Sequence, residues 1–183
     1  MKFRRDNKIN DVIYIEPDVF GDERGYFFEA YHEDKFKEQG LQFKVVQSNQ
    51  SKSRQGVLRG LHLQKAPKEQ AKLVRVLDGR IFDVAVDVRQ DSATFGMWTG
   101  YELNSKQNNM LFIPGGFAHG LYVLSDSATV FYQCNHVYAP ESELTLRYDD
   151  PELNIDWPFE GQPILSSKDK EGFSLRQLSN IID

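Results

Sequence analysis

Two of the four histidines stand in apolar segments and are the first candidates for chemistry. His62 lies in the string GVLRGLHLQ, and His119 follows a Pro-Gly turn in IPGGFAHG. A neutral imidazole can take up a proton near neutral pH, and a carboxylate bonded to its second nitrogen fixes its tautomer. Spacing alone does not choose among three candidates for that carboxylate: Asp83, Asp87 and Asp169. The alternative, and the commoner one for an isolated histidine in such a strand, is a core residue that a backbone carbonyl satisfies.

Two further side chains suit proton chemistry beside a carbonyl group. Lys72 is a cation in the apolar string QAKLVR, where it could stabilise a developing oxyanion. Tyr132, in TVFYQC, could donate a proton from the face opposite the histidine. The alternatives are a lysine that extends to solvent from an outward position and a buried tyrosine whose hydroxyl is already bonded.

A bound metal is a competing hypothesis for the same two segments. His62, Gln64 and Glu69, followed by Pro114-x-Gly116-x-x-His119, resemble the metal-binding pattern of the cupins. Gln64 stands where that pattern has a second histidine, and an amide is a poorer transition-metal ligand than an imidazole. The residues therefore favour metal-free proton transfer, with a metal-dependent cupin oxygenase or isomerase as the alternative.

The elements that must position these residues are mostly strands. Apolar residues alternate with polar ones in RIFDVAVDV, which predicts a strand with one buried face. Similar runs predict further strands at residues 12–15, 25–31, 43–48, 56–64, 71–77, 95–102, 110–113, 119–124 and 129–137. Helices are expected only at residues 33–39 and near 173–178. Many short strands with turns between them favour an all-β jelly-roll barrel or sandwich with a few short helices.

Length and composition limit the classes of function. The 183 residues suit a single domain, residues 1–183. We expect its N-terminal strands, to about residue 50, to be able to join a dimer interface. We expect its C-terminal tail, from about residue 150, to wrap the barrel. The net charge of −5 with scattered basic residues argues against a nucleic-acid partner. No apolar run approaches the ~20 residues of a membrane span, and the start MKFRRDNKIN lacks a signal peptide's apolar core. A single cysteine, Cys134, excludes an intrachain disulfide and favours the cytoplasm.

Taken together, the ordered motifs resemble one enzyme family. The strings are FGDERGYFFEAY, VVQSNQSKS, GVLRGLHLQ, QAKLVRVLDGRIFDVAVDVR, FIPGGFAHGL, YAPESE and SSKD. They closely resemble the RmlC-type dTDP-4-dehydrorhamnose 3,5-epimerases of deoxysugar biosynthesis, over about residues 12–169. The resemblance implies a cupin-like jelly roll, a homodimer, a nucleotide-sugar substrate and no cofactor or metal.

The same resemblance implies roles for individual residues. His62 matches the base that removes protons beside the C4 ketone of a nucleotide-linked 4-keto-6-deoxyhexose, and Asp169 matches its carboxylate partner. Lys72 matches the residue that stabilises the enolate, and Tyr132 the acid on the opposite face. Nucleotide-sugar binding falls on Arg24, Glu29, Gln47, Asn49, Arg59, His119, Tyr138, Glu143 and Lys168. Inversion at one carbon only, or a binding module without turnover, are the alternatives.

These roles make a geometric demand on the strand at residues 56–64. Regular alternation places Leu58, Gly60, His62 and Gln64 on one face and Arg59 on the other. Arg59 can help to hold a diphosphate beside His62 only if the strand twists or bulges. We therefore expect an irregularity near Gly60.

Overall fold

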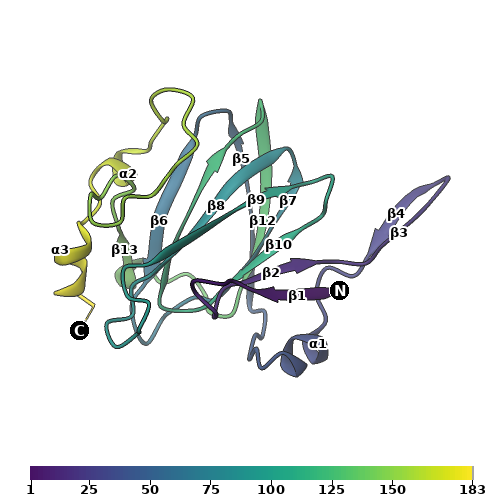
Figure 1. Cartoon of the computed structure of the whole chain (residues 1–183), viewed down its shortest axis with the longest axis horizontal. Coiled ribbons are helices and arrows are strands. Elements are labelled where there is room, and N and C mark those ends of the chain that lie inside the picture. The colour runs from purple at the N-terminus through teal and green to yellow at the C-terminus, as the bar shows by residue number, and fades with distance from the viewer. Residues whose placement is uncertain (183) are drawn as a thin grey trace.

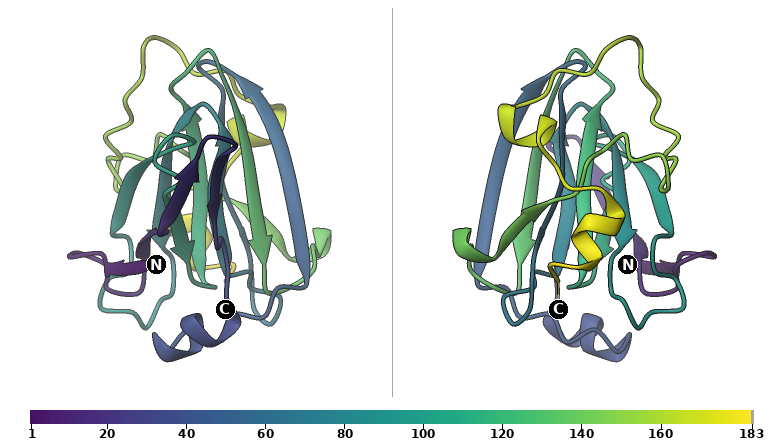
Figure 2. Two further views of the ribbon diagram at one scale, coloured as in Figure 1. Left: turned by 90° about the vertical axis from the view of Figure 1, so that its right-hand side faces the viewer. Right: turned by 90° about the vertical axis from the view of Figure 1, so that its left-hand side faces the viewer.

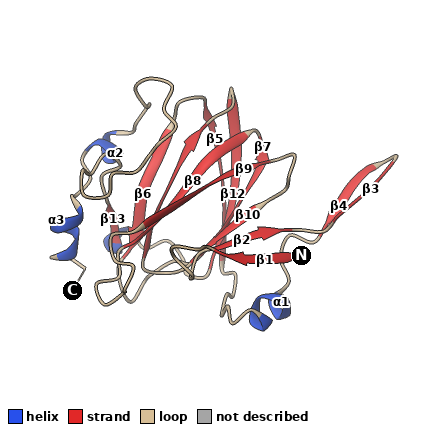
Figure 3. Cartoon of the chain, viewed as in Figure 1, coloured by secondary structure: helices blue, strands red, loops and turns tan. Residues whose placement is uncertain are grey.

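The computed structural model describes residues 1–182, and most of its regular structure is β-strand (Figure 3). Two sheets face each other, and a hairpin projects from them (Figures 1 and 2). In order, the six-stranded sheet contains β1 (Lys2–Arg5), β2 (Ile13–Glu16), β10 (Met110–Ile113), β7 (Lys72–Asp78), β12 (Ser127–Cys134) and β5 (Gln47–Arg54). The five-stranded sheet contains β13 (Glu143–Thr145), β6 (Leu58–Gln64), β11 (Phe117–Val123), β8 (Arg80–Asp87) and β9 (Trp98–Asn104).

The remaining elements are short. The projecting hairpin consists of β3 (Val19–Asp22) and β4 (Gly25–Phe28). The helices are α1 (Glu33–Glu38), the 3-10 turn η1 (Pro140–Ser142), α2 (Ser167–Lys170) and α3 (Leu175–Ser179). Neighbouring strands in both sheets pair antiparallel, and most neighbours are not consecutive in sequence. The predicted all-β jelly roll is thus confirmed.

The core between the sheets is apolar along most of its length and polar at one end. Inward side chains of both sheets form a buried cluster that includes Val74, Val130 and Leu121. Along β7, β12 and β11, the next inward positions are Lys72, Tyr132 and His119, one from each strand. The fold therefore gathers polar groups at one end of an otherwise apolar interior.

The outer face of the five-stranded sheet is covered as well. Leu153, Trp157 and Leu178 of the C-terminal segment pack in one cluster with Val84 and Val86 of β8. The expectation of one buried face for β8 is therefore wrong: Asp83 and Asp87, on its inward side, are fully buried too. The C-terminal tail covers the valines, as predicted, and α2 within it returns to β6.

Some element boundaries differ from the prediction. The two expected helices are present as α1 and α3, and the strand expected at residues 43–48 begins only at Gln47 as β5. The short strands β1, β3 and β13 and the helix α2 lie outside the predicted elements. No helix within the described part of the chain has the length and apolar character that crossing a membrane requires.

Candidate active site

A cavity lies at the polar end of the barrel, between the two sheets. It consists of two adjoining hollows of about 300 Å³ each, which share His62, Lys72 and Tyr132. His62 belongs to the five-stranded sheet, whereas Lys72 and Tyr132 belong to the six-stranded sheet. The predicted base therefore faces the predicted cation and acid from the opposite wall. The first hollow also contains Gln47, Asn49, Gln64, Tyr138 and Glu143, and the second contains Arg59, His119, Lys168 and Asp169.

An irregularity in β6 places Arg59 beside this cavity. His62 pairs with His119 of β11, and Arg59 pairs with Leu121, so three steps on β6 oppose two on β11. Gly60 lies inside this bulge with φ +131°, and a Cβ atom there would stand 2.5 Å from the Cα atom of Gly120. The irregularity expected near Gly60 is thus confirmed.

The bulge also corrects the predicted faces of β6. Alternation predicts Leu58 on the face of His62, but Leu58 packs with Leu61 and Leu63 beneath the C-terminal tail. The extra residue changes the alternation between Leu58 and Leu61. Only the part of β6 from Leu61 onward follows the predicted order.

His62 forms a close pair with Asp169. Its Nε2 atom lies 2.6 Å from Oδ1 of Asp169, which is buried in α2. The hydroxyl of Ser166 donates to the other carboxylate oxygen at 2.7 Å. Burial alone would raise the pKa of Asp169, but the hydrogen bonds from His62 and Ser166 outweigh it and lower the pKa below its usual value. An ionised carboxylate accepts, so Nε2 of His62 carries the proton and Nδ1 has the free lone pair.

His119 has a carboxylate partner of its own. Its Nε2 atom lies 2.8 Å from Oδ1 of Asp83, and both side chains are almost completely buried. Burial lowers the pKa of His119, although Asp83 opposes this change. Asp87, the third candidate carboxylate, instead accepts bonds from Arg89, Ser92 and Thr94. Each of the three candidate aspartates thus has a different partner.

Lys72 and Tyr132 supply the opposite wall. Lys72 is buried, and within residues 1–182 its ammonium group has neither an ion pair nor a hydrogen bond. Burial lowers its pKa, while the nearby carboxylates of Asp83 and Glu143 act in the opposite direction. Burial raises the pKa of Tyr132, so its phenol keeps its proton at neutral pH.

The rim of the cavity carries a connected set of polar groups. The hydroxyl of Tyr138 donates to Glu143 at 2.7 Å, and Glu143 also pairs with Lys168 of α2. Gln47 donates to Asn49 at 3.0 Å and accepts from the backbone N–H of Tyr138 at 2.8 Å. Exposed Tyr138 presents an aromatic ring next to cationic and amide side chains.

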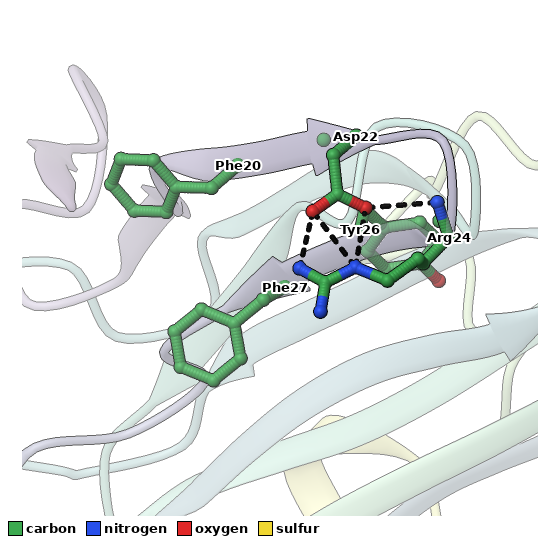
Figure 4. A pocket seen from close by; sticks show the side chains of 7 residues that line it. Phe20, Asp22, Arg24, Tyr26 and Phe27 are labelled. Carbon is green, nitrogen blue, oxygen red and sulfur yellow. Dashed lines mark hydrogen bonds and ion pairs between the residues drawn. The ribbon is translucent and has the colours of Figure 1, made fainter.

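Two of the predicted binding residues do not reach this cavity. Arg24 lies at the exposed tip of the hairpin, where its guanidinium pairs with Asp22 (Figure 4). Glu29 follows the hairpin and accepts from Lys35 at 2.7 Å. Within one chain, these two side chains are separate from His62 and its neighbours.

The ligands of the alternative metal site are engaged elsewhere. The Nε2 atoms of His62 and His119 each face a carboxylate, and Glu69 lies against the Gly115–Gly116 turn. Among the described residues, no group of three or more His, Cys, Asp or Glu side chains is arranged to hold a metal ion. The geometry does not favour the metal hypothesis.

Sequence reasoning misses two residues of this site. Ser166 caps α2 and bonds Asp169 on both its backbone N–H and its carboxylate. The Ser-x-x-Asp spacing, typical of a helix start, is the available signal. Asp83 enters the sequence reasoning only as a partner of His62, and no local pattern pairs it with His119.

Comparison with known proteins identifies the family of this chain. The profile of the family described as dTDP-4-dehydrorhamnose 3,5-epimerase matches residues 6–177. A relative of that name from Pseudomonas aeruginosa is 50% identical over 165 residues, which cover 90% of this chain and 91% of the relative. Another, from Methanothermobacter thermautotrophicus, is 49% identical over 171 residues and 92% of each chain.

Solved structures extend this likeness to three dimensions. The 3,5-epimerase RmlC of Legionella pneumophila, determined in complex with dTDP-4-keto-L-rhamnose, superposes with a TM-score of 0.94. It is 44% identical, and the match covers 99% of this chain and 96% of that one. With a family profile over nearly the whole chain and relatives at about half identity, the chain belongs to the dTDP-4-dehydrorhamnose 3,5-epimerase family.

Proposed function

We propose that this protein inverts C3 and C5 of dTDP-4-keto-6-deoxyglucose to give dTDP-4-keto-L-rhamnose, without a cofactor. The observation that carries the proposal is the His62–Asp169 pair, which faces Lys72 and Tyr132 across one cavity. Membership of the family supports the reaction, and the Legionella relative was solved with dTDP-4-keto-L-rhamnose.

His62 acts first, as the general base. The ionised Asp169 holds the Nε2 proton, which leaves Nδ1 to remove a proton from the carbon beside the ketone. Such a proton is acidic because its loss delocalises charge onto the C4 oxygen. Asp169 then stabilises the imidazolium that forms, at a hydrogen-bond distance of 2.6 Å.

Lys72 and Tyr132 complete the inversion from the other wall. Lys72 has no competing partner among the described residues, so its ammonium group is free to meet the enolate oxygen. Tyr132 returns a proton to the face opposite His62, which inverts the carbon. Its raised pKa keeps the phenol protonated until that step. Proton exchange with water then restores the neutral imidazole of His62 and the phenol of Tyr132, and the same groups act at the second carbon.

The rim residues hold the nucleotide. Arg59 and Lys168 provide positive charge for the diphosphate, and a forked guanidinium suits phosphate oxygens. Tyr138 offers an exposed ring on which a planar base can stack. Gln47, Asn49, His119 and Glu143 supply the remaining polar contacts.

Arg24 and Glu29 enter this scheme only through a second copy of the chain. We therefore propose a homodimer in which the hairpin of each copy reaches the other's cavity. The hairpin's exposed aromatics support this: Phe20, Tyr26 and Phe27 are 66%, 63% and 69% exposed in one chain. Clustered apolar surface of this kind marks an interaction site. We also propose that the dimer works in the cytoplasm, in line with the unpaired thiol of Cys134.

Deuterium incorporation tests the proposed reaction. The wild-type protein, incubated with dTDP-4-keto-6-deoxyglucose in D₂O, should place deuterium at both C3 and C5. His62→Ala should abolish the exchange at both carbons. Label at C3 alone would replace the proposal with a mono-epimerase, and no label at either carbon would rule out epimerisation of this sugar.

A further inference from the structure

Gln64 uses two of its three side-chain hydrogen bonds to hold the segment that carries Tyr138. It lies two residues after His62 at the end of β6, is 4% exposed and lines the first hollow of the cavity. Its Oε1 atom accepts from the backbone N–H of Ala139 at 2.8 Å. Its Nε2 atom donates to the carbonyl oxygens of Lys68 at 2.6 Å and Val137 at 3.3 Å. A primary amide has two N–H groups and one carbonyl, so all three parts are engaged.

The segment held in this way has no regular structure. Residues 135–139 connect β12 to η1 without strand or helix. Gln64 binds the carbonyl of Val137 and the N–H of Ala139, and Gln47 binds the N–H of Tyr138 between them. Gln47 belongs to β5 of one sheet and Gln64 to β6 of the other. Two glutamines thus fix three consecutive residues across the mouth of the cavity.

This arrangement leaves the ring of Tyr138 exposed, with hydrogen bonds at both its backbone and its hydroxyl. Its backbone is fixed by the two glutamines, and its hydroxyl is fixed by Glu143. A side chain that is already ordered loses less conformational entropy when a ligand binds. The proton-transfer mechanism gives Gln64 no role.

We infer that Gln64 is a positioning residue for nucleotide binding, which acts by holding the 137–139 segment so that Tyr138 presents its ring to the base. The inference rests on the proposed function, since it takes Tyr138 to contact the nucleotide. Gln64 itself transfers no proton. Its loss should weaken binding of the nucleotide part and leave the chemistry at the sugar intact.

Kinetics separate these two effects. Gln64→Leu removes all three hydrogen bonds, and Gln64→Glu keeps the acceptor but loses both donors. Each variant should raise KM for the nucleotide sugar and the Kd for dTDP by about tenfold, which corresponds to the loss of one or two net hydrogen bonds. In both variants kcat should stay within about twofold, because a uniform loss of binding leaves kcat unchanged. A fall in kcat at unchanged KM would overturn the inference.

A double-mutant cycle tests whether the effect passes through Tyr138. Tyr138→Ala removes the ring, and adding Gln64→Leu to it should then raise the Kd for dTDP by less than about twofold. A further increase of about tenfold in the Kd for dTDP would show that Gln64 acts independently of Tyr138 and would contradict the inference. Gln55→Leu is the matched control, because Gln55 is exposed and lies outside the cavity, and within residues 1–182 its side chain makes only long hydrogen bonds, at 3.5 Å.

Amide hydrogen exchange reports on the segment without any ligand. In Gln64→Leu the N–H of Ala139 loses its acceptor, so exchange in residues 135–142 should accelerate about tenfold while exchange in β8 is unchanged. Faster exchange throughout would indicate a misfolded variant, and Gln64→Glu then provides the test. A wild-type protein that neither binds dTDP nor turns over the sugar would overturn the proposed function. Normal wild-type turnover with unchanged KM and exchange in both variants would overturn only the inference about Gln64.

Discussion

The two histidines of the cavity differ in exposure, although each faces an aspartate. The side chain of His62 is 29% exposed and that of His119 is 8% exposed, so only His62 is open enough to exchange protons with a substrate and then with water. The amino-acid types and their strands are predictable from the sequence. The pairing is not, because Asp169 lies 107 residues after His62 and no local pattern relates them. Only the resemblance to a family selects Asp169.

Lys72 illustrates a conflict between activity and stability in a single side chain. Replacement by Met removes the group that we propose to meet the enolate, so kcat should fall about 10²–10³-fold. The same replacement should raise the melting temperature, since burial lowers the pKa of Lys72 and makes its charged form unfavourable in the folded protein. Thermal melts and initial rates of Lys72→Met measure both effects.

The pH dependence of the melting temperature tests whether the charged form of Lys72 destabilises the folded protein. Below the usual lysine pKa of 10.5, the unfolded chain binds this proton more readily than the folded protein, so the wild type loses stability there. As the pH rises toward 10.5, the melting temperatures of the wild type and Lys72→Met should converge. Lys52→Met, at an exposed position of β5, should change neither rate nor stability. A Lys72→Met protein less stable than the wild type at pH 7 would contradict the expectation.

Among the elements, β6 departs most from its sequence pattern. Alternation predicts its second half correctly, but the bulge at Gly60 exchanges the faces of Leu58 and Arg59. Buried β8 departs for another reason, since the tail that covers its outer face comes from a distant part of the chain. The unpredicted strands β1 and β13 are short edge strands that pair on one side only, and neither shows a clear apolar alternation.

The bulge in β6 predicts a specific cost for a methyl group at Gly60. In Gly60→Ala the new Cβ would stand 2.5 Å from Cα of Gly120 and 2.8 Å from the carbonyl oxygen of His119. The two strands must then separate, so the free energy of unfolding should fall by about 2 kcal/mol or more. Urea unfolding measures this loss of stability. The rate of epimerisation should fall as well, because Arg59 moves from the cavity.

Gly161→Ala is the matched control for that substitution. Gly161 also has a positive φ, +111°, but no atom lies within 4 Å of the point where a Cβ atom would stand. The free energy of unfolding of Gly161→Ala should therefore fall by only about 1 kcal/mol, from backbone strain alone. If the free energy of unfolding falls equally in the two variants, contact between position 60 and β11 does not contribute to the loss of stability.

At the scale of the whole molecule, one chain contains a cavity and a hairpin that do not meet. The sequence predicts a homodimer through the family resemblance, but the separation of Arg24 from His62 becomes visible only in the folded chain. In the proposed dimer, strands near the start of one chain contribute to a site that the rest of another copy forms.

Mixed dimers test this proposed assembly. Arg24→Glu and His62→Ala should each inactivate a homodimer. After co-expression, half of the dimers are mixed, and one cavity in each mixed dimer combines His62 with Arg24 from the other chain, so about one quarter of the wild-type activity should return. If the hairpin served its own cavity, every cavity in the mixture would lack one residue and no activity would return.

The position of Asp169 in the C-terminal segment has a consequence for biosynthesis. The ribosome makes His62 long before its carboxylate partner, because 107 residues separate them. A nascent chain can already contain the base, the cation and the phenol while the segment with α2 is still inside the exit tunnel. It has no paired base until that segment emerges and folds against β6. In the proposed mechanism, proton transfer therefore waits until the outer layer of the barrel is in place.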